Sequence, residues 1–252
     1  MGTSLLWIAG IVLESVILFR FLKHRLYAHY SFFFAYLVLV WSSEITLWPV
    51  YRYHFASYSR LFWADQFLTL LAGFGVLFEI IRKCFQRYPG ARTFATSVLA
   101  AMFAILCGYF VFQLLPSSVT VYAGFSDLER DFRAIQALTL CGVLVVISYY
   151  RIEVGRNLFG IIAGVGLYVG STILSDELKR YVGPAFNTAW SVIQPHAYLL
   201  SLIVWVFTLW SYAPPAAPEV PAEIDDGYEA FARQTQNTLG TMKAAVSKAD
   251  RP

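Results

Sequence analysis

Three ionisable side chains lie within long apolar stretches of this sequence. Glu14 follows the run SLLWIAGIVL, Glu44 follows the run FFFAYLVLVWSS, and His196 lies in the run WSVIQPHAYLLSLIV. An ionisable group among apolar residues is costly to bury, so it usually faces a protein interior, a cavity or a charged partner. Two carboxylates and an imidazole in such a setting could bind a small molecule or an ion, or could serve as coupling groups for transport.

Other chemistries receive little support from the residue pattern. Glu14, Glu44 and His196 form a possible oxygen and nitrogen set, yet no HExxH or other local metal-ligand spacing occurs. A membrane bis-His haem site would need paired histidines at matching depth, and the other histidines lie at segment ends. No GxSxG motif is present, so the sequence gives no reason to expect a hydrolase or another enzyme.

The elements that position these groups must tolerate a strongly apolar composition. Of 252 residues, 58% are hydrophobic and 14% are charged, and the mean hydropathy is +0.57. Soluble domains carry about 25% charged residues, so lipid is the natural solvent for most of this chain. The net charge of +3 and the scattered basic residues do not indicate nucleic-acid binding.

Seven stretches are long and apolar enough to form helices that cross a bilayer, which takes about 20 residues each. The pattern therefore predicts an all-α membrane protein, a seven-transmembrane-helix bundle. A retinal Schiff base needs a lysine within such a segment, but all five lysines lie outside, which excludes retinal as a cofactor. The predicted segments are residues 4–22, 31–51, 60–81, 94–115, 132–150, 158–175 and 187–212.

The distribution of Lys and Arg predicts an outside N-terminus and a cytoplasmic C-terminus. The first, third and fifth connectors hold nine of these cations and the other three connectors hold six. Cytoplasmic loops carry the excess of positive charge. The apolar run that begins the first segment is followed by Arg20, Lys23 and Arg25, and no cation precedes it. We therefore expect an N-out, C-in protein.

In this topology Glu14, Glu44 and His196 share one layer of the outer half. At about 1.5 Å per helical residue they lie about 10–15 Å below the outer ends of their segments. Pro195 should kink the last segment beside His196. Two interpretations remain open: a buried network that fixes helix register, or a pocket open to the outside. The candidate ligand-binding residues, which include four at shallower depth, are Glu14, Glu44, Asp65, Gln66, Arg133, Gln136 and His196.

A charged string, DLERDFR at 127–133, precedes the fifth segment. Acidic residues near a helix N-terminus suit the helix dipole, so a solvated helix start explains the string. The alternative is an outer lid over the pocket, with Arg133 as its anion-binding residue.

The sixth segment contains two pairs of glycines with helical spacing, Gly160/Gly164 and Gly166/Gly170. Small residues four apart allow close helix contact in membranes. A glycine-rich nucleotide loop does not explain them, because the spacing is not GxGxxG and the run lies inside an apolar segment. We expect tight helix packing at all four.

The composition changes after Tyr212. Residues 213–221, APPAAPEVP, hold four prolines and read as a semi-rigid linker. Apolar residues then recur at steps of three or four within residues 222–248, which predicts a short cytoplasmic helix. This helix could lie on the bilayer or the bundle, could dock a cytoplasmic protein partner, or could be disordered.

Two stretches, LERDFRAIQAL at 128–138 and YYRIEVGRNLFGIIAGVGLY at 149–168, resemble uncharacterised bacterial seven-span membrane proteins. This resemblance implies a bacterial inner-membrane setting and no particular activity. The residues that carry it are Arg130, Arg133, Gln136, Arg151, Gly155, Arg156, Asn157 and Gly160.

The sequence thus predicts a bundle over residues 1–212 and a linker with a tail helix over residues 213–252. Three functions fit: a sensory or small-ligand-binding module that signals through a cytoplasmic partner, a small-molecule or ion transporter, and a structural subunit of a membrane complex. We rank them in that order and expect no cofactor.

Overall fold

The computed structural model describes residues 2–53, 55–86, 88–114, 121–182, 184–212 and 233–235. Every regular element in these ranges is helical, which confirms the all-helical fold class there. The bundle elements are α1 (Gly2–Lys23), the short 3-10 helix η1 (Leu26–Ala28), α2 (Ser31–Tyr53), α3 (Phe55–Cys84), α4 (Pro89–Leu114), α5 (Val121–Tyr149), α6 (Arg156–Val182) and α7 (Pro184–Thr208).

Four of these helices contain stretches long and apolar enough to cross a membrane: Leu5–Lys23, Ala64–Cys84, Glu129–Tyr149 and Arg156–Ser175. Shorter apolar stretches lie in α2 and α7, at Ser31–Leu47 and Ile193–Thr208. Four helices of this length and composition suggest a membrane protein. Of the predicted tail, only residues 233–235 are described, and they are helical.

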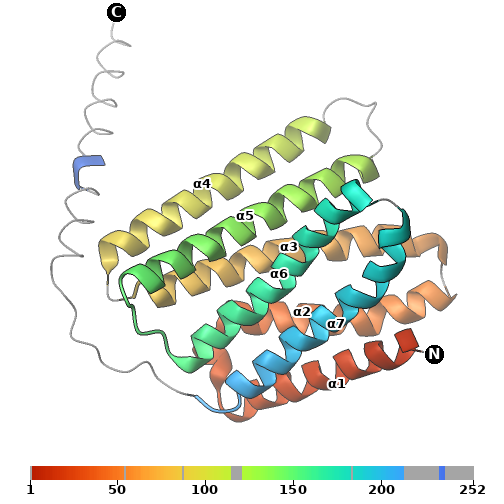
Figure 1. Ribbon diagram of the computed structural model, residues 1–252, viewed down its shortest axis with the longest axis horizontal. Helices are drawn as coiled ribbons and strands as arrows, with labels where there is room; N and C mark the ends of the chain where they lie inside the picture. The colour runs from red at the N-terminus through yellow and green to blue at the C-terminus, as the bar shows by residue number, and fades with distance from the viewer. Residues whose placement is uncertain are drawn as a thin grey trace, which may run out of the picture.

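Within the described residues, six of the α-helices pack in a closed ring and α4 lies outside it. Around the ring, α1 packs against α2, α2 against α3, α3 against α5, α5 against α6, α6 against α7, and α7 against α1 again. α4 contacts only α3 and α5 among the helices, and Figure 1 shows it at the edge of the bundle beside α5. Side chains that point into the ring therefore come from α1, α2, α3, α5, α6 and α7.

Aromatic rings fill two parts of the core. Phe33 packs edge-on against Trp205 with ring centroids 5.0 Å apart, which joins α2 to α7. Phe74, Phe103 and Phe132 join α3, α4 and α5, with ring centroids 5.0–5.9 Å apart. Such contacts contribute beyond their buried area because the rings meet edge to face.

The outer faces of the helices carry large apolar side chains. On α1 alone, Leu5, Ile8, Val12, Phe19 and Leu22 are exposed, while Glu14 on the inner face is fully buried. A soluble protein arranges these groups the other way round. This reversal is what a bilayer as solvent requires, because lipid accepts apolar side chains and polar groups need partners inside the bundle.

Two of the four predicted packing glycines lie at the contact between α6 and α7. A Cβ at Gly160 would overlap the side chain of Thr208, and a Cβ at Gly164 would overlap the indole of Trp205. A Cβ at Gly166 or Gly170 would meet no atom within 4 Å in the described part of the chain. The expected close contact therefore does not extend to Gly166 and Gly170, which lie on other faces of α6.

The contact between α6 and α7 gives a direct stability test. Gly160→Ala and Gly164→Ala should each lower the free energy of unfolding by about 1–3 kcal/mol, because overpacking forces the helices apart. Gly166→Ala should be neutral or stabilising, because alanine favours a helix over glycine by about 1 kcal/mol. Thermal denaturation of the three detergent-purified variants and of the wild type measures these differences in stability. Equal effects at all three positions would contradict the packing described here.

Candidate functional site

Two carboxylates from neighbouring helices meet inside the ring. Glu14 of α1 is fully buried, and Glu44 of α2 is partly buried. The Tyr198 hydroxyl of α7 donates a hydrogen bond to Glu14 Oε1. Gly10, one turn before Glu14, lies between Glu44 and Tyr198. A Cβ at Gly10 would be 3.8 Å from Glu44 Oε2 and 3.9 Å from Tyr198 Cε1. The structure thus brings the two sequence-predicted carboxylates together.

The second oxygen of each carboxyl group is unsatisfied. Glu14 Oε2 and Glu44 Oε2 are both buried, and neither has a hydrogen-bond partner in the described part of the chain. The two groups also interact with each other electrostatically. Two like-charged groups in a medium of low dielectric constant repel strongly, and burial without a partner adds a desolvation cost. The arrangement therefore favours a positive charge or a proton between them.

Hydroxyl and indole groups surround the carboxylate pair. The Ser43 hydroxyl, next to Glu44 in the chain, donates a hydrogen bond to Asp65 Oδ1 of α3. Trp41 Nε1 donates to the Ser15 hydroxyl at 3.0 Å, next to Glu14. Asp65 therefore belongs to the same region of the bundle as the pair. Gln66 follows it on α3 with a partly buried side chain.

A buried cation lies on the other side of the ring. Arg133 of α5 is 5% exposed, and its Nε and Nη2 atoms donate to Glu129 Oε1 at 2.9 and 2.7 Å. The two residues are four apart on one helix, the spacing at which helical side chains meet. The charge of Arg133 is thus balanced within α5.

Two tyrosines connect the carboxylate pair to the arginine. The Arg133 guanidinium lies 5.5 Å from the centroid of the Tyr168 ring on α6. The Tyr168 ring meets the Tyr198 ring edge to face at 5.7 Å. One hydrogen bond and two ring contacts therefore link Glu14 through Tyr198 and Tyr168 to Arg133, and Glu44 interacts electrostatically with Glu14.

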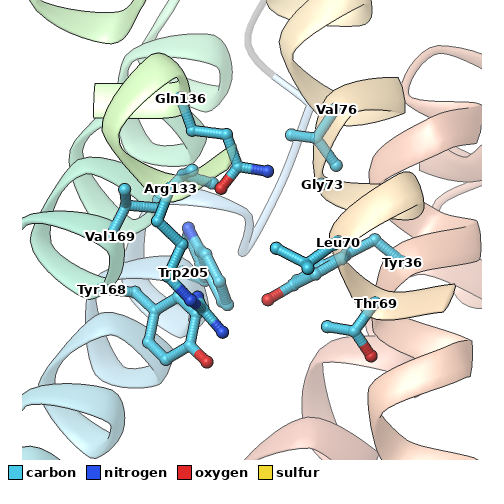
Figure 2. Close-up of a pocket in the computed structure, with 11 residues that line it drawn as sticks. Tyr36, Thr69, Leu70, Gly73, Val76, Arg133, Gln136, Tyr168, Val169 and Trp205 are labelled. Carbon is cyan, nitrogen blue, oxygen red and sulfur yellow. The ribbon is translucent and has the colours of Figure 1, made fainter. Parts of the chain in front are cut away.

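A small cavity lies beside this arginine, between five helices. Its volume is about 20 Å³, enough for one water molecule. Figure 2 shows Arg133 and Gln136 reaching into the space from one side, and Tyr36, Leu70 and Thr69 lining the other. Gln136 comes close to α3 because the facing residue is Gly73, where a Cβ would lie 2.7 Å from the amide nitrogen.

The sequence placed Arg133 near the start of its apolar segment, and the apolar stretch of α5, Glu129–Tyr149, likewise begins only four residues before it. The helix itself begins earlier, at Val121, so about 18 Å of α5 precede Arg133. Its neighbour Glu129 is partly buried as its ion-pair partner, so this part of the charged string is not a solvated helix start. Arg133 lines the cavity together with Gln136.

The structure places His196 and Tyr198 on different faces of α7. The His196 side chain is exposed on α7, whereas Tyr198 faces inward. Each residue turns a helix by about 100°, so residues two apart are about 200° apart around the helix axis and lie on nearly opposite faces. Only one of the two can therefore face the interior. α7 continues as a helix through Pro195.

The sequence analysis missed the aromatic members of the site: Tyr36, Tyr168, Tyr198 and Trp205. They gave no distinct signal, because the chain has 16 tyrosines and 7 tryptophans. Glu79, a carboxylate in the apolar run GFGVLFEII, was also overlooked, although its position in the run was a usable signal.

Comparison with protein-family models, curated proteins and solved structures gives no match.

The buried ion pair predicts a characteristic pattern of stabilities. Glu129→Leu leaves the buried charge of Arg133 without its partner and should lower the free energy of unfolding by about 3–5 kcal/mol. Adding Arg133→Met should recover most of that loss, because no charge is then left unpaired. Chemical denaturation of both variants and of Arg133→Met alone measures the coupling.

The control is Asp131→Asn, which removes a more exposed pair with Arg130 at 3.5 Å. Exposed pairs contribute up to about 1 kcal/mol, so its effect should be small. A double variant no more stable than Glu129→Leu would show that the two side chains are not coupled.

Proposed function

We propose that this chain is a seven-span, N-out membrane protein that binds a small cation at Glu14 and Glu44 in the outer half of the bilayer. The simplest occupants are a proton and an alkali ion. The resemblance of residues 128–138 and 149–168 to bacterial proteins suggests a bacterial cytoplasmic membrane. The ligand-binding event would act on a cytoplasmic partner through residues 222–248, which lie outside the described residues apart from 233–235.

One observation carries this proposal: two carboxyl oxygens, Glu14 Oε2 and Glu44 Oε2, are buried without a partner. The only hydrogen bond to either group within the described residues comes from Tyr198, and it reaches the other oxygen of Glu14. A buried carboxylate pair is stable when a positive charge compensates it. Arg133 does not supply this positive charge, because Glu129 already binds its guanidinium group.

The donor atoms support a hard cation as ligand. Carboxylate and phenol oxygens suit a proton or a hard metal ion, whereas soft metals prefer thiolates and thioethers. Glu44 is partly exposed and Glu14 is fully buried. A cation would therefore meet Glu44 first and Glu14 second.

Transport is the second candidate, and the series of contacts between polar and aromatic side chains favours it. From Glu44 to Arg133 the series crosses from α2 through α1, α7 and α6 to α5. Chains of ionisable and hydroxyl groups within membranes mark ion and proton pathways. A sensor and a carrier would share the carboxylate pair and differ in whether the cation leaves on the far side.

Cation binding is measured by thermal denaturation of the purified protein in Li⁺, Na⁺ and K⁺ salts at constant ionic strength and at several pH values. A cation at 100 times its dissociation constant stabilises the folded state by about 2.7 kcal/mol. We expect this stabilisation in the wild type, and its loss in Glu14→Gln and Glu44→Gln. Glu153→Gln, at an exposed connector position, is the matched control and should behave as wild type.

The two candidate functions separate in sealed vesicles. A cation flux that Glu44→Gln abolishes would identify a transporter, and binding without flux would favour the sensory module. If neither salt nor pH changes the stability of the wild type, and both glutamine variants are folded, the cation site does not exist. Copurification with other proteins at fixed stoichiometry would then point to a structural subunit.

A further inference from the structure

A polar pocket lies at the end of the bundle where α3 turns into α4, away from the carboxylate pair. Its volume is about 250 Å³. It lies between the start of α2 and the corner that joins α3 to α4. Three cations from that corner line it, Arg82, Lys83 and Arg92, and His29 lies opposite.

The one carboxylate in the pocket lining is already engaged. Glu79 accepts hydrogen bonds from Phe33 N at 2.9 Å, Phe32 N at 3.3 Å and the Ser31 hydroxyl at 3.4 Å. These are orphan donors of the α2 N-terminus, so Glu79 of α3 caps that helix across the bundle. Its hydrogen bonds are thus used by α2, although the carboxylate still interacts electrostatically with Lys83 at the corner.

Glu79 also interacts electrostatically with Lys83, so one carboxylate stands against three cations in the pocket lining. Within the described ranges, no ion pair joins Arg82, Lys83 or Arg92 to a carboxylate. Lys83 Nζ lies 5.7 Å from the centroid of the Tyr30 ring. Burial raises the pKa of Tyr30, so this phenol stays neutral and adds no negative charge. The pocket carries a net positive charge that suits a phosphate group.

An apolar groove begins at the same corner. It has a volume of about 330 Å³ and lies between α4 and α5, with Phe94, Val98, Met102, Leu138 and Val143 in its lining. The chain itself joins the two cavities. Ile81, Phe85 and Ala91 line the groove, and the residues that follow each of them, Arg82, Gln86 and Arg92, line the polar pocket. The groove exists because α4 stands outside the ring and meets only α3 and α5.

We propose that this corner binds an anionic phospholipid, with the phosphodiester headgroup in the basic pocket and an acyl chain in the groove. The inference needs α3 and α4 to be in a bilayer and is independent of the cation site at Glu14 and Glu44. Basic pockets between membrane helices bind anionic headgroups. A soluble phosphate would satisfy the cations and leave the apolar groove unused, so the lipid accounts for both cavities.

The first arm of the test measures which molecule binds. The full chain, purified in detergent and delipidated, is titrated with phosphatidylglycerol, phosphatidylcholine and glycerol 3-phosphate, and bound lipid is counted by native mass spectrometry. We expect one tightly bound phosphatidylglycerol and much weaker binding of the other two. Equal binding of glycerol 3-phosphate and phosphatidylglycerol would overturn the lipid proposal in favour of a soluble phosphate.

The second arm tests the pocket residues. Arg82→Gln, Lys83→Gln and Arg92→Gln together should weaken phosphatidylglycerol binding about a hundredfold, since each cation near a headgroup contributes about fivefold. The matched control is Lys23→Gln, Arg25→Gln and Arg151→Gln, which removes the same charge from exposed positions at the same end of the bundle. Arg82→Gln alone, with an expected fivefold loss, serves if the triple variant does not fold. Equal weakening by both triple variants would reduce the site to surface charge and overturn the proposal.

The third arm tests the groove. Gly142 lines it, and a Cβ there meets no atom within 4 Å in the described chain, so Gly142→Phe fills the groove without a clash at its base. Gly108→Phe on α4 is the control, because Gly108 has equal space and lies outside the groove lining. We expect Gly142→Phe to weaken phosphatidylglycerol binding at least tenfold and Gly108→Phe to leave it unchanged. No effect of Gly142→Phe in a folded protein would show that no acyl chain lies in the groove.

Discussion

The hydrogen bond from Tyr198 to Glu14 joins the last helix of the bundle to the first and so closes the ring. Within a bilayer no water competes for polar groups, so such a bond has to be made inside the protein. Glu14 can be fully buried only because the ring is closed around it, and the tight contact of α6 with α7 at Gly160 and Gly164 sets where Tyr198 stands. The arrangement of the polar side chains inside the bundle therefore depends on the contact between Tyr198 and Glu14.

The charges of the protein are distributed unevenly along the bundle. Around Arg133 the cation and Glu129 balance each other. At Glu14 and Glu44 two acidic groups meet with no cation paired to them in the described residues, and at the corner of α3 and α4 three cations are offset only in part by Glu79. A charge that the protein does not neutralise itself invites a ligand of opposite sign, because the cost of leaving it alone in an apolar setting is high. The two unbalanced places are therefore the two proposed sites, one for a cation and one for a phosphodiester.

Residue chemistry in the sequence led to part of the site, and helix geometry explains what it missed. Glu14, Glu44, Asp65, Arg133 and Gln136 were found because a polar residue stands out in an apolar segment. His196 was grouped with them by depth alone, yet it points away from the interior while Tyr198 points in. The glycine spacing likewise predicted packing at four positions, and in the described part of the chain Gly160 and Gly164 face a neighbouring helix whereas Gly166 and Gly170 do not. The position of a residue along its apolar segment can be counted in the sequence. The side of the helix on which a side chain lies cannot, because a helix that is apolar on all sides has no periodic pattern of polar residues.

The sequence by itself determined that this chain forms apolar helices in a membrane, because the free energy of burying so many apolar residues in lipid depends only on composition and run length. It also determined which polar side chains would be expensive to bury. Only the tertiary structure decided that Glu14 meets Glu44, that Glu129 neutralises Arg133 inside the bundle, and that Glu79 caps α2. The reason is that these pairings depend on the rotation and order of the helices, and those are set by the close contacts of small and aromatic side chains between helices distant in sequence.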